Sequence, residues 1–305
     1  MVEIVAEGRN LTKRYGDKTV VDGIHFQIKR GECFGFLGPN GAGKTSTMKM
    51  MYCLSPVSSG ELYVLGLDVT TRGKEIKKRI GVVPQEDGLD TDFTVLENLL
   101  VYASYHNIPR EMAERRAREL LRFMRIDEKS AATVDQLSGG MKRRLALARG
   151  MINAPEMLFL DEPTTGLDPQ ARLLMWDNLR ALKSEGMSMI LTTHYMEEAE
   201  KICDRLVIMD NGKFLCEGRP QDLINEHIGH EVVEFTSDDK DKNYFIEKVK
   251  NNYDYQVIRN RFHLFIKNGQ DGKKAVATIP SSDVTIRKAT LEDVFLKVAG
   301  HELKE

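Results

Sequence analysis

Short apolar segments alternate with longer amphipathic ones along the first two-thirds of the chain. The apolar segments have strand length and lie at 34–37, 62–65, 80–84, 157–160 and 189–192. The stretches between them carry apolar residues at helical spacing. Strands that alternate with helices are typical of a largely parallel α/β sheet. The alternation of apolar and polar positions on both sides of 29–32 also predicts an antiparallel hairpin of 20–28 with 33–37.

The strand pattern disappears between residues 95 and 148. Three amphipathic helices are predicted there instead, at 95–106, 110–125 and 138–151. We therefore expect a helical subdomain, about residues 90–152, inserted into the α/β core. Glutamates intersperse the arginines of the second helix, which favours a solvated face, and contact with a membrane subunit or anionic headgroups is the alternative.

The pattern changes again after Arg205. Residues 206–209 and 213–216 are predicted to form a hairpin through Asp210-Asn211-Gly212, a strong turn signal. The segments beyond residue 225 predict the order β, α, β, β, α, β, α, at 231–236, 244–251, 255–260, 262–267, 273–279, 284–288 and 291–298. We expect two domains, residues 1–225 and a small α+β domain of residues 226–305. For the last helix we expect a packing role, with regulation or dimer support as the alternative.

Charge and composition narrow the class of protein. The 44 Lys and Arg residues nearly balance 46 Asp and Glu, giving a net charge of −2, so we expect no nucleic-acid partner. The longest apolar runs are far shorter than the roughly 18 residues of a membrane span, and no charged-then-apolar leader is expected. The 4 cysteines form no CxxC pair, which fits a reducing compartment, and we expect a cytoplasmic protein.

A glycine-rich loop separates the strand 34–37 from the helix predicted at 44–53. The loop matches the pattern G-x-x-x-x-G-K-[ST] and reads Gly38, Pro39, Asn40, Gly41, Ala42, Gly43, Lys44 and Thr45, followed by Ser46. Glycines allow backbone N–H groups to converge on phosphate oxygens, and the helix N-terminus adds partial positive charge. We expect Lys44 to reach the β- and γ-phosphates and the Thr45 hydroxyl to bind Mg²⁺.

Two carboxylates follow the buried strand 157–160. Asp161 is expected to hold Mg²⁺, directly or through water, and Glu162 to polarise a water for attack on the γ-phosphate. His194 ends the strand 190–193, where it is expected to sense the γ-phosphate. An acidic pair can also be a solvated or capping feature, and the phosphate loop upstream is what favours catalysis here.

The segment Leu137-Ser138-Gly139-Gly140-Met141 resembles the LSGGQ signature of ABC-type ATPases, with Met141 where glutamine is commonest. The resemblance extends from Tyr15 to about Gly218 and implies a P-loop NTPase (RecA-like) core with an antiparallel β part. It also implies roles for single residues: adenine stacking by Tyr15, a link from the Mg²⁺ site to a transmembrane partner by Gln85, a dimer-crossing loop at Asp168, and a switch role for His194.

The residue types of the signature segment (137–141) themselves indicate an anion-binding site. Ser138 is a good helix N-cap and the glycines permit close backbone approach, so this helix start is a second anion site. In the family, the signature of one protomer closes over the nucleotide of the other, which implies a homodimer, or pairing with a similar ATPase subunit, around two ATP molecules. No Asn-Lys-x-Asp segment is present, and Tyr15 offers a stacking platform, so ATP is favoured over GTP.

Within the family, residues 80–100 and 291–296 resemble the exporter group that handles drugs, lipo-oligosaccharides and polysaccharides, including nodulation-factor and daunorubicin-type exporters. This resemblance implies an ATPase subunit that powers a permease from the inner face of the membrane. The alternative is a soluble ABC-type switch acting as a binding module, although the chain lacks the second cassette or long coiled coil typical of such proteins. Gating of a membrane signalling complex without transport is not separated by the sequence.

Overall fold

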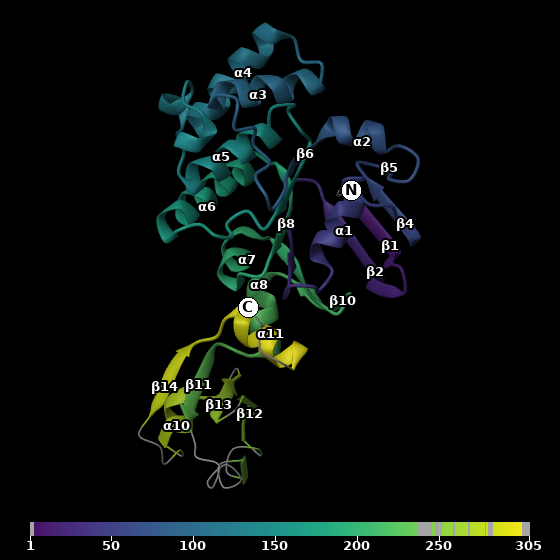
Figure 1. Cartoon of the computed structure of the whole chain (residues 1–305). Coiled ribbons are helices and arrows are strands. Elements are labelled where there is room, and N and C mark those ends of the chain that lie inside the picture. Colours follow the sequence, from purple (N-terminus) through teal and green to yellow (C-terminus); the bar gives the residue numbers. More distant parts are fainter. Residues whose placement is uncertain are drawn as a thin grey trace. The chain divides into compact units, whose positions relative to one another are not determined.

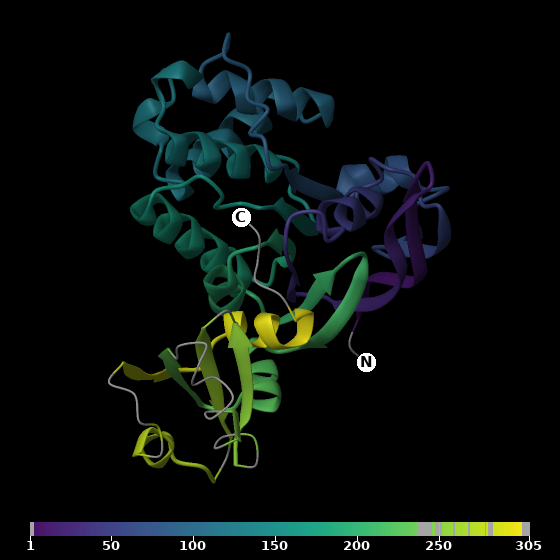
Figure 2. The ribbon, with the colours of Figure 1, turned by 60° about the horizontal axis from the view of Figure 1, so that its bottom comes forward.

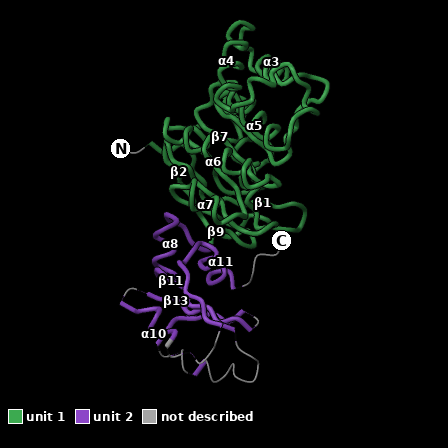
Figure 3. Tube along the Cα trace, turned by 90° about the vertical axis from the view of Figure 1, so that its left-hand side faces the viewer, with its two compact units in different colours: residues 1–214, 305 green, residues 215–304 purple. Residues whose placement is uncertain are grey.

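The computed structural model describes residues 3–236, 246–247, 250, 252–258, 260–267, 269–277, 279 and 283–300. The chain divides into two compact units, unit 1 up to Phe214 and unit 2 from Leu215 (Figure 3). No helix in these described ranges is long and apolar enough to cross a bilayer.

Unit 1 contains an antiparallel sheet with the strand order β2-β1-β4-β5. Its strands are β1 (Ile4–Tyr15), β2 (Lys18–Lys29), β4 (Ser59–Val64) and β5 (Leu67–Asp68). The predicted hairpin of 20–28 with 33–37 is wrong, because β2 pairs with β1 instead. The segment 33–37 is wholly buried and lies between two parallel partners in a second sheet, so residues 30–32 connect the two sheets.

The second sheet has the order β10-β9-β3-β8-β7-β6. Its strands are β3 (Cys33–Leu37), β6 (Ile80–Val83), β7 (Met157–Asp161), β8 (Ser188–Thr193), β9 (Arg205–Asp210) and β10 (Lys213–Gly218). The strands β9, β3, β8, β7 and β6 pair in parallel, which confirms the predicted α/β core. Every residue of β3, β7 and β8 is buried, as expected for parallel strands covered on both faces. The phosphate loop and the acidic pair leave the sheet at the carboxyl ends of β3 and β7.

The remaining helices of unit 1 form two groups. The helices α1 (Lys44–Met51), α2 (Gly73–Arg79), α6 (Pro169–Ser184) and α7 (Met196–Ile202) connect strands. The predicted helical subdomain comprises α3 (Val95–Tyr105), α4 (Arg110–Phe123) and α5 (Gly139–Gly150), with short 3₁₀ turns η1 (Asp127–Lys129) and η2 (Val134–Gln136). Figures 1 and 2 show α3, α4 and α5 together at one end of unit 1, away from β1 and β2. On α4, Glu114 pairs with Arg110 and Arg118, which fits a solvated face.

Unit 2 is an antiparallel sheet of order β12-β13-β11-β14 with three helices among its described residues. Its elements are α8 (Pro220–His227), β11 (Glu231–Thr236), β12 (Asp254–Ile258), β13 (Arg261–Ile266), α10 (Gly272–Ala277), β14 (Val284–Lys288) and α11 (Leu291–Ala299). Because α8 packs against α11, contacts divide the chain before α8, whereas the sequence places the boundary after residue 225. The helix predicted at 244–251 falls mostly outside the described residues.

Candidate functional site

The phosphate loop joins β3 to α1, and two of its positions accept only glycine. Gly38 has a φ of 158°, and a Cβ there would lie 2.0 Å from the carbonyl oxygen of Met209. Gly43 has a φ of 108°, and its Cβ would lie 2.4 Å from the carbonyl oxygen of Val20. The loop therefore packs so closely on β2 and β9 that its backbone path is fixed.

Lys44 is the first residue of α1 and is only 4% exposed. Its Nζ donates to the carbonyl oxygens of Gly38 at 2.7 Å and Pro39 at 3.0 Å. The same atom lies 3.6 Å from Glu162 Oε1. Burial lowers the pKa of Lys44, and the carboxylates of Glu162 and Asp161 oppose that shift. The ammonium group thus lies between the phosphate loop and the acidic end of β7.

Asp161 accepts hydrogen bonds from hydroxyl groups on two other elements, α1 and β8. Thr45 Oγ1 donates to Asp161 Oδ1 at 2.9 Å, and Thr192 Oγ1 donates to the same oxygen at 2.5 Å. Thr192 lies directly opposite Asp161 in the register of β8 with β7. Hydroxyl and carboxylate oxygens are ligands that Mg²⁺ prefers, so Thr45 and Asp161 fit this ion. Sequence reasoning missed Thr192, whose one signal is a polar residue at the carboxyl end of an apolar strand.

Glu162 has a φ of 48°, and this left-handed turn gives its side chain partners different from those of Asp161. Glu162 Oε2 accepts a hydrogen bond from Thr165 Oγ1 at 2.8 Å, and His194 Nδ1 lies 2.7 Å from the same oxygen. Burial acts to raise the pKa of Glu162, but His194, Thr165 and Lys44 together lower it below its ordinary value. The carboxylate is therefore ionised at neutral pH and able to accept a proton.

The two signature glycines, Gly139 and Gly140, begin α5 and have different surroundings. Ser138 caps the helix by accepting a hydrogen bond from the Met141 amide at 3.3 Å. A Cβ at Gly140 would lie 2.6 Å from the Cβ of Ala171 on α6, whereas a Cβ at Gly139 would meet no atom within 4 Å. Gly140 is thus required for packing inside the protein, and Gly139 faces open space.

Comparison with known proteins gives the family. A family model described as "ABC transporter" matches residues 21–165. The Nod factor export ATP-binding protein I of Burkholderia orbicola is 43% identical, covering 97% of this chain and 97% of its own. The protein of the same name from Ralstonia nicotianae is 44% identical, covering 97% and 94%. The chain belongs to the ATP-binding subunits of ABC transporters. Members of this family bind ATP and hydrolyse it, and this chain is an ATPase.

Similar solved structures are also ATP-binding cassettes of ABC transporters. The cbiO1 protein of Clostridium perfringens, described as part of the ABC transporter complex cbiONQ, matches with a TM-score of 0.67 and 27% identity, covering 72% of this chain and 90% of that one. A dimeric ATP-binding cassette bound to ADP and phosphate matches with a TM-score of 0.65 and 25% identity, covering 70% and 98%. The predicted fold, a P-loop NTPase core of the ABC type, is confirmed.

Among the described interactions, the predicted residues Tyr15 and Asp168 contact neither Lys44 nor Glu162. Tyr15 is 50% exposed, with Lys13 Nζ 4.7 Å from its ring centroid. Hydrogen bonding with Ser55 and, more weakly, with Ser46 lowers the pKa of Tyr15 against its burial. Asp168 caps α6 by accepting from the Ala171 amide at 2.8 Å.

Gln85 is exposed in the loop after β6, and its carbonyl oxygen accepts from the Arg143 guanidinium at 3.0 Å. Sequence reasoning did not identify Arg143. The signal available was a set of three arginines, at 143, 144 and 149, on a helix that is otherwise mostly apolar and buried. Arginines on a buried helix need hydrogen-bond acceptors, and loop carbonyls provide them here.

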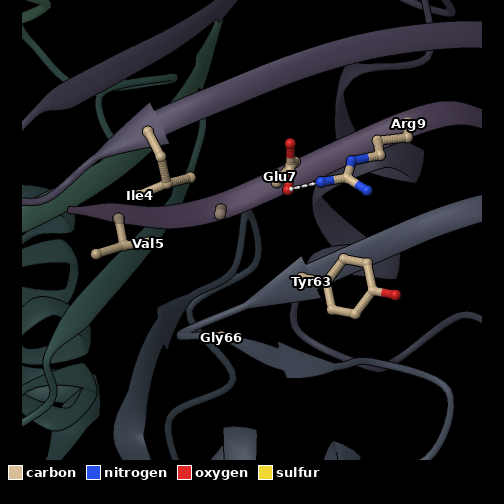
Figure 4. Close-up of a pocket in the computed structure, with 7 residues that line it drawn as sticks. Ile4, Val5, Glu7, Arg9, Tyr63 and Gly66 are labelled. Carbon is tan, nitrogen blue, oxygen red and sulfur yellow. Dashed lines mark hydrogen bonds and ion pairs between the residues drawn. The ribbon is translucent and has the colours of Figure 1, made fainter. Parts of the chain in front are cut away.

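A groove of about 310 Å³ also lies along β1, and Figure 4 shows the residues that line it. Its one charged pair is Arg9 with Glu7, 2.9 Å apart, and each group neutralises the other. The lining comes from residues 4–7, Arg9, Tyr63 and Gly66, and none of it from the phosphate loop, so the groove is not part of the nucleotide site.

Proposed function

We propose that this ABC ATPase subunit powers a membrane permease that exports a drug, a lipid-linked compound or an oligosaccharide-type substrate. The observation that carries the proposal is the similarity to relatives named for Nod factor export over 97% of the chain. The subunit would act in the cytoplasm, at the inner face of the membrane, through contacts with the permease.

In this proposal Lys44 and the amides of the phosphate loop bind the β- and γ-phosphates of ATP. Thr45 and Asp161 would hold Mg²⁺, with Gln85 reaching the same ion from the loop after β6. When bound, the ion neutralises charge on the phosphate oxygens. The 2.9 Å approach of Thr45 Oγ1 to Asp161 Oδ1 supports this pairing, because both oxygens are within reach of one small ion.

Glu162 is the proposed general base. Its ionised carboxylate accepts a proton from the attacking water, a new bond forms between that oxygen and the γ-phosphorus, and the bond to ADP breaks. Thr165 and His194 fix the carboxylate from one side, and Lys44 lies at its other oxygen. His194 is 26% exposed, and this exposed part is proposed to contact the γ-phosphate.

Two copies of the chain would complete each nucleotide site. Ser138 and Gly139 start a helix, and a Cβ at Gly139 would meet no atom within 4 Å, so this helix start has room for an anion. This helix start is proposed to close over the γ-phosphate held by a second copy or a similar subunit, with Asp168 at the interface and Tyr15 stacked on adenine. A dimeric cassette among the structural neighbours supports this arrangement.

The proposal is tested by capture from native membranes. Tagged Glu162→Gln protein, which should hold ATP without hydrolysing it, is purified in mild detergent with ATP and Mg²⁺, and co-purifying chains are identified by mass spectrometry. The control is the Glu162→Gln/Lys44→Ala double variant, used at an ATP concentration that its weaker binding leaves unoccupied. Recovery of a polytopic membrane protein supports the exporter proposal. Recovery of soluble partners alone, from protein that dimerises, contradicts it in favour of a soluble ABC-type switch.

A further inference from the structure

Arg143 lies on α5, five residues after the Ser138 cap, and is only 4% exposed. One edge of its guanidinium binds the backbone around Glu162. Nε donates to the carbonyl oxygen of Pro163 at 2.8 Å, and Nη2 donates to those of Asp161 at 2.9 Å and Glu162 at 3.0 Å. One side chain therefore binds the three consecutive carbonyl oxygens of residues 161–163.

The other edge of the guanidinium binds the loop that carries Gln85. Nη1 donates to the carbonyl oxygens of Pro84 at 2.6 Å and Gln85 at 3.0 Å. The same nitrogen lies 3.2 Å from Asp87 Oδ1. A planar guanidinium has fixed donor directions, so these acceptors cannot shift independently without losing a hydrogen bond.

The sheet explains why one side chain reaches both loops. β6 and β7 are parallel neighbours, with Val83 opposite Leu160. Their carboxyl ends therefore release the Gln85 loop and the Asp161–Pro163 segment at the same edge of the sheet. Arg143 enters between these two segments from α5, the helix whose N-terminus is the signature.

A second arginine of α5 strengthens the hold on the Gln85 loop. Arg149 donates to the carbonyl oxygens of Asp87 at 2.6 Å and Gly88 at 2.5 Å. Within the described part of the chain, Arg149 has no hydrogen bond to residues 161–163, whereas Arg143 binds both segments. Among the side chains that the structure describes, Arg143 is thus the one on α5 whose hydrogen bonds join the Gln85 loop to the backbone of Glu162.

We propose that Arg143 is a positioning residue that sets the geometry of Glu162 according to the positions of the Gln85 loop and of α5. A displacement of either element pulls on the carbonyls of residues 161–163 through the guanidinium. Hydrolysis is then fast only when the signature helix and the Gln85 loop are both in place. This inference rests on the proposed role of Glu162 as general base.

The test is the steady-state ATPase activity of purified full-length Arg143→Gln protein. We expect kcat to fall about 10²-fold, because small misplacements of a catalytic group have effects of this size. KM for ATP should change less than about threefold, since Arg143 does not contact the phosphate loop. Arg143→Lys keeps the charge but loses the planar guanidinium that binds both loops. We expect its kcat to be about tenfold higher than that of Arg143→Gln.

The matched control is Arg116→Gln. Arg116 is a partly buried arginine of the helical subdomain. Its Nε and Nη2 donate to the carbonyl oxygen of Met151 at 3.3 and 3.0 Å, and among the described residues it has no hydrogen bond to either loop. Its kcat, per folded molecule, should equal that of the wild type. The inference is overturned if Arg143→Gln or Arg143→Lys keeps wild-type kcat, or if Arg143→Gln loses no more than Arg116→Gln. Normal activity of Glu162→Gln would instead contradict the proposed function, and this inference with it.

Discussion

His194 Nδ1 lies 2.7 Å from Glu162 Oε2, although the two residues follow different strands of the core sheet, β8 and β7. The pairing places the imidazole ring directly against the proposed base. It also helps to lower the pKa of Glu162 despite burial, so the carboxylate stays ionised in a buried site. The relationship depends on the parallel pairing of β7 with β8, which brings residues 161 and 192 side by side.

Replacing Glu162 by Gln removes the proton acceptor and leaves the shape of the side chain. We expect ATP turnover to fall about 10²- to 10⁴-fold, the usual effect of losing a general base. ATP binding should persist, because Lys44 and the phosphate loop are unchanged. Phosphate release and nucleotide binding by the same preparation measure the two effects. Turnover near the wild-type rate would remove Glu162 from the role of base.

Replacing Lys44 by Ala should act on binding instead. The ammonium is the cation beside the phosphate loop, 2.7 Å from the Gly38 carbonyl, and its loss removes the charge expected at the β- and γ-phosphates. Affinity for ATP, measured by calorimetry, should fall about tenfold or more, since charge-assisted hydrogen bonds contribute more than neutral ones. A variant that binds ATP as tightly as the wild type contradicts the phosphate assignment.

The two signature glycines should respond differently to the same substitution. Gly140→Ala places a methyl group 2.6 Å from the Cβ of Ala171 and should lower the free energy of unfolding by about 1–3 kcal/mol, as overpacking does. Gly139→Ala meets no neighbour within 4 Å and should leave stability unchanged or slightly higher. Denaturant unfolding of both variants checks this difference, and equal destabilisation would contradict it.

Gly139→Ala should nevertheless weaken ATP-dependent association, because the added methyl group projects into the space proposed for the partner's nucleotide. Size-exclusion chromatography of Glu162→Gln protein, with and without the Gly139→Ala change, measures the effect in the presence of ATP and Mg²⁺. Undiminished dimerisation would mean that this helix start does not close over nucleotide.

The lowered pKa of Glu162 gives a pH dependence of stability. A carboxyl group whose pKa is lower in the folded than in the unfolded state stabilises the fold above the unfolded value, and that contribution is lost as pH falls through the folded value. The wild type should therefore lose stability relative to Glu162→Gln as pH falls below 4.5, the ordinary pKa of a glutamate side chain. Denaturant unfolding at a series of pH values checks the sign, and a difference that favours the wild type more at lower pH would contradict it.

The sequence predicted the parts of this site whose chemistry is encoded locally. The phosphate loop, the acidic pair and the signature segment are each continuous, and their residue types alone restrict the backbone or the charge. The helices at 95–106 and 110–125 were also predictable, because each buries one apolar face. The helix at 138–151 was predicted as well, although α5 is buried at every position from Arg143 to Gly150.

Pairings between distant segments could not be read in the same way. The β-alternation of 20–28 is equally compatible with pairing to β1 or to β3, and burial of β3 between two parallel strands decides the outcome. Arg143 and Thr192 are similar cases, since their partners at 84–87 and 161–163 become neighbours only through strand order. The roles of side chains that bind loop carbonyls depend on tertiary contacts, which no local pattern encodes.

In the proposed function, each chain carries two half-sites, and two chains complete each other's sites around ATP. The most direct measurement is analytical ultracentrifugation of Glu162→Gln protein with labelled ATP and Mg²⁺, with the Glu162→Gln/Lys44→Ala variant as the control. We expect a complex of two chains that holds two ATP molecules and is absent from the control. A chain that binds ATP and stays monomeric at every protein concentration tested would show that the two half-sites do not meet.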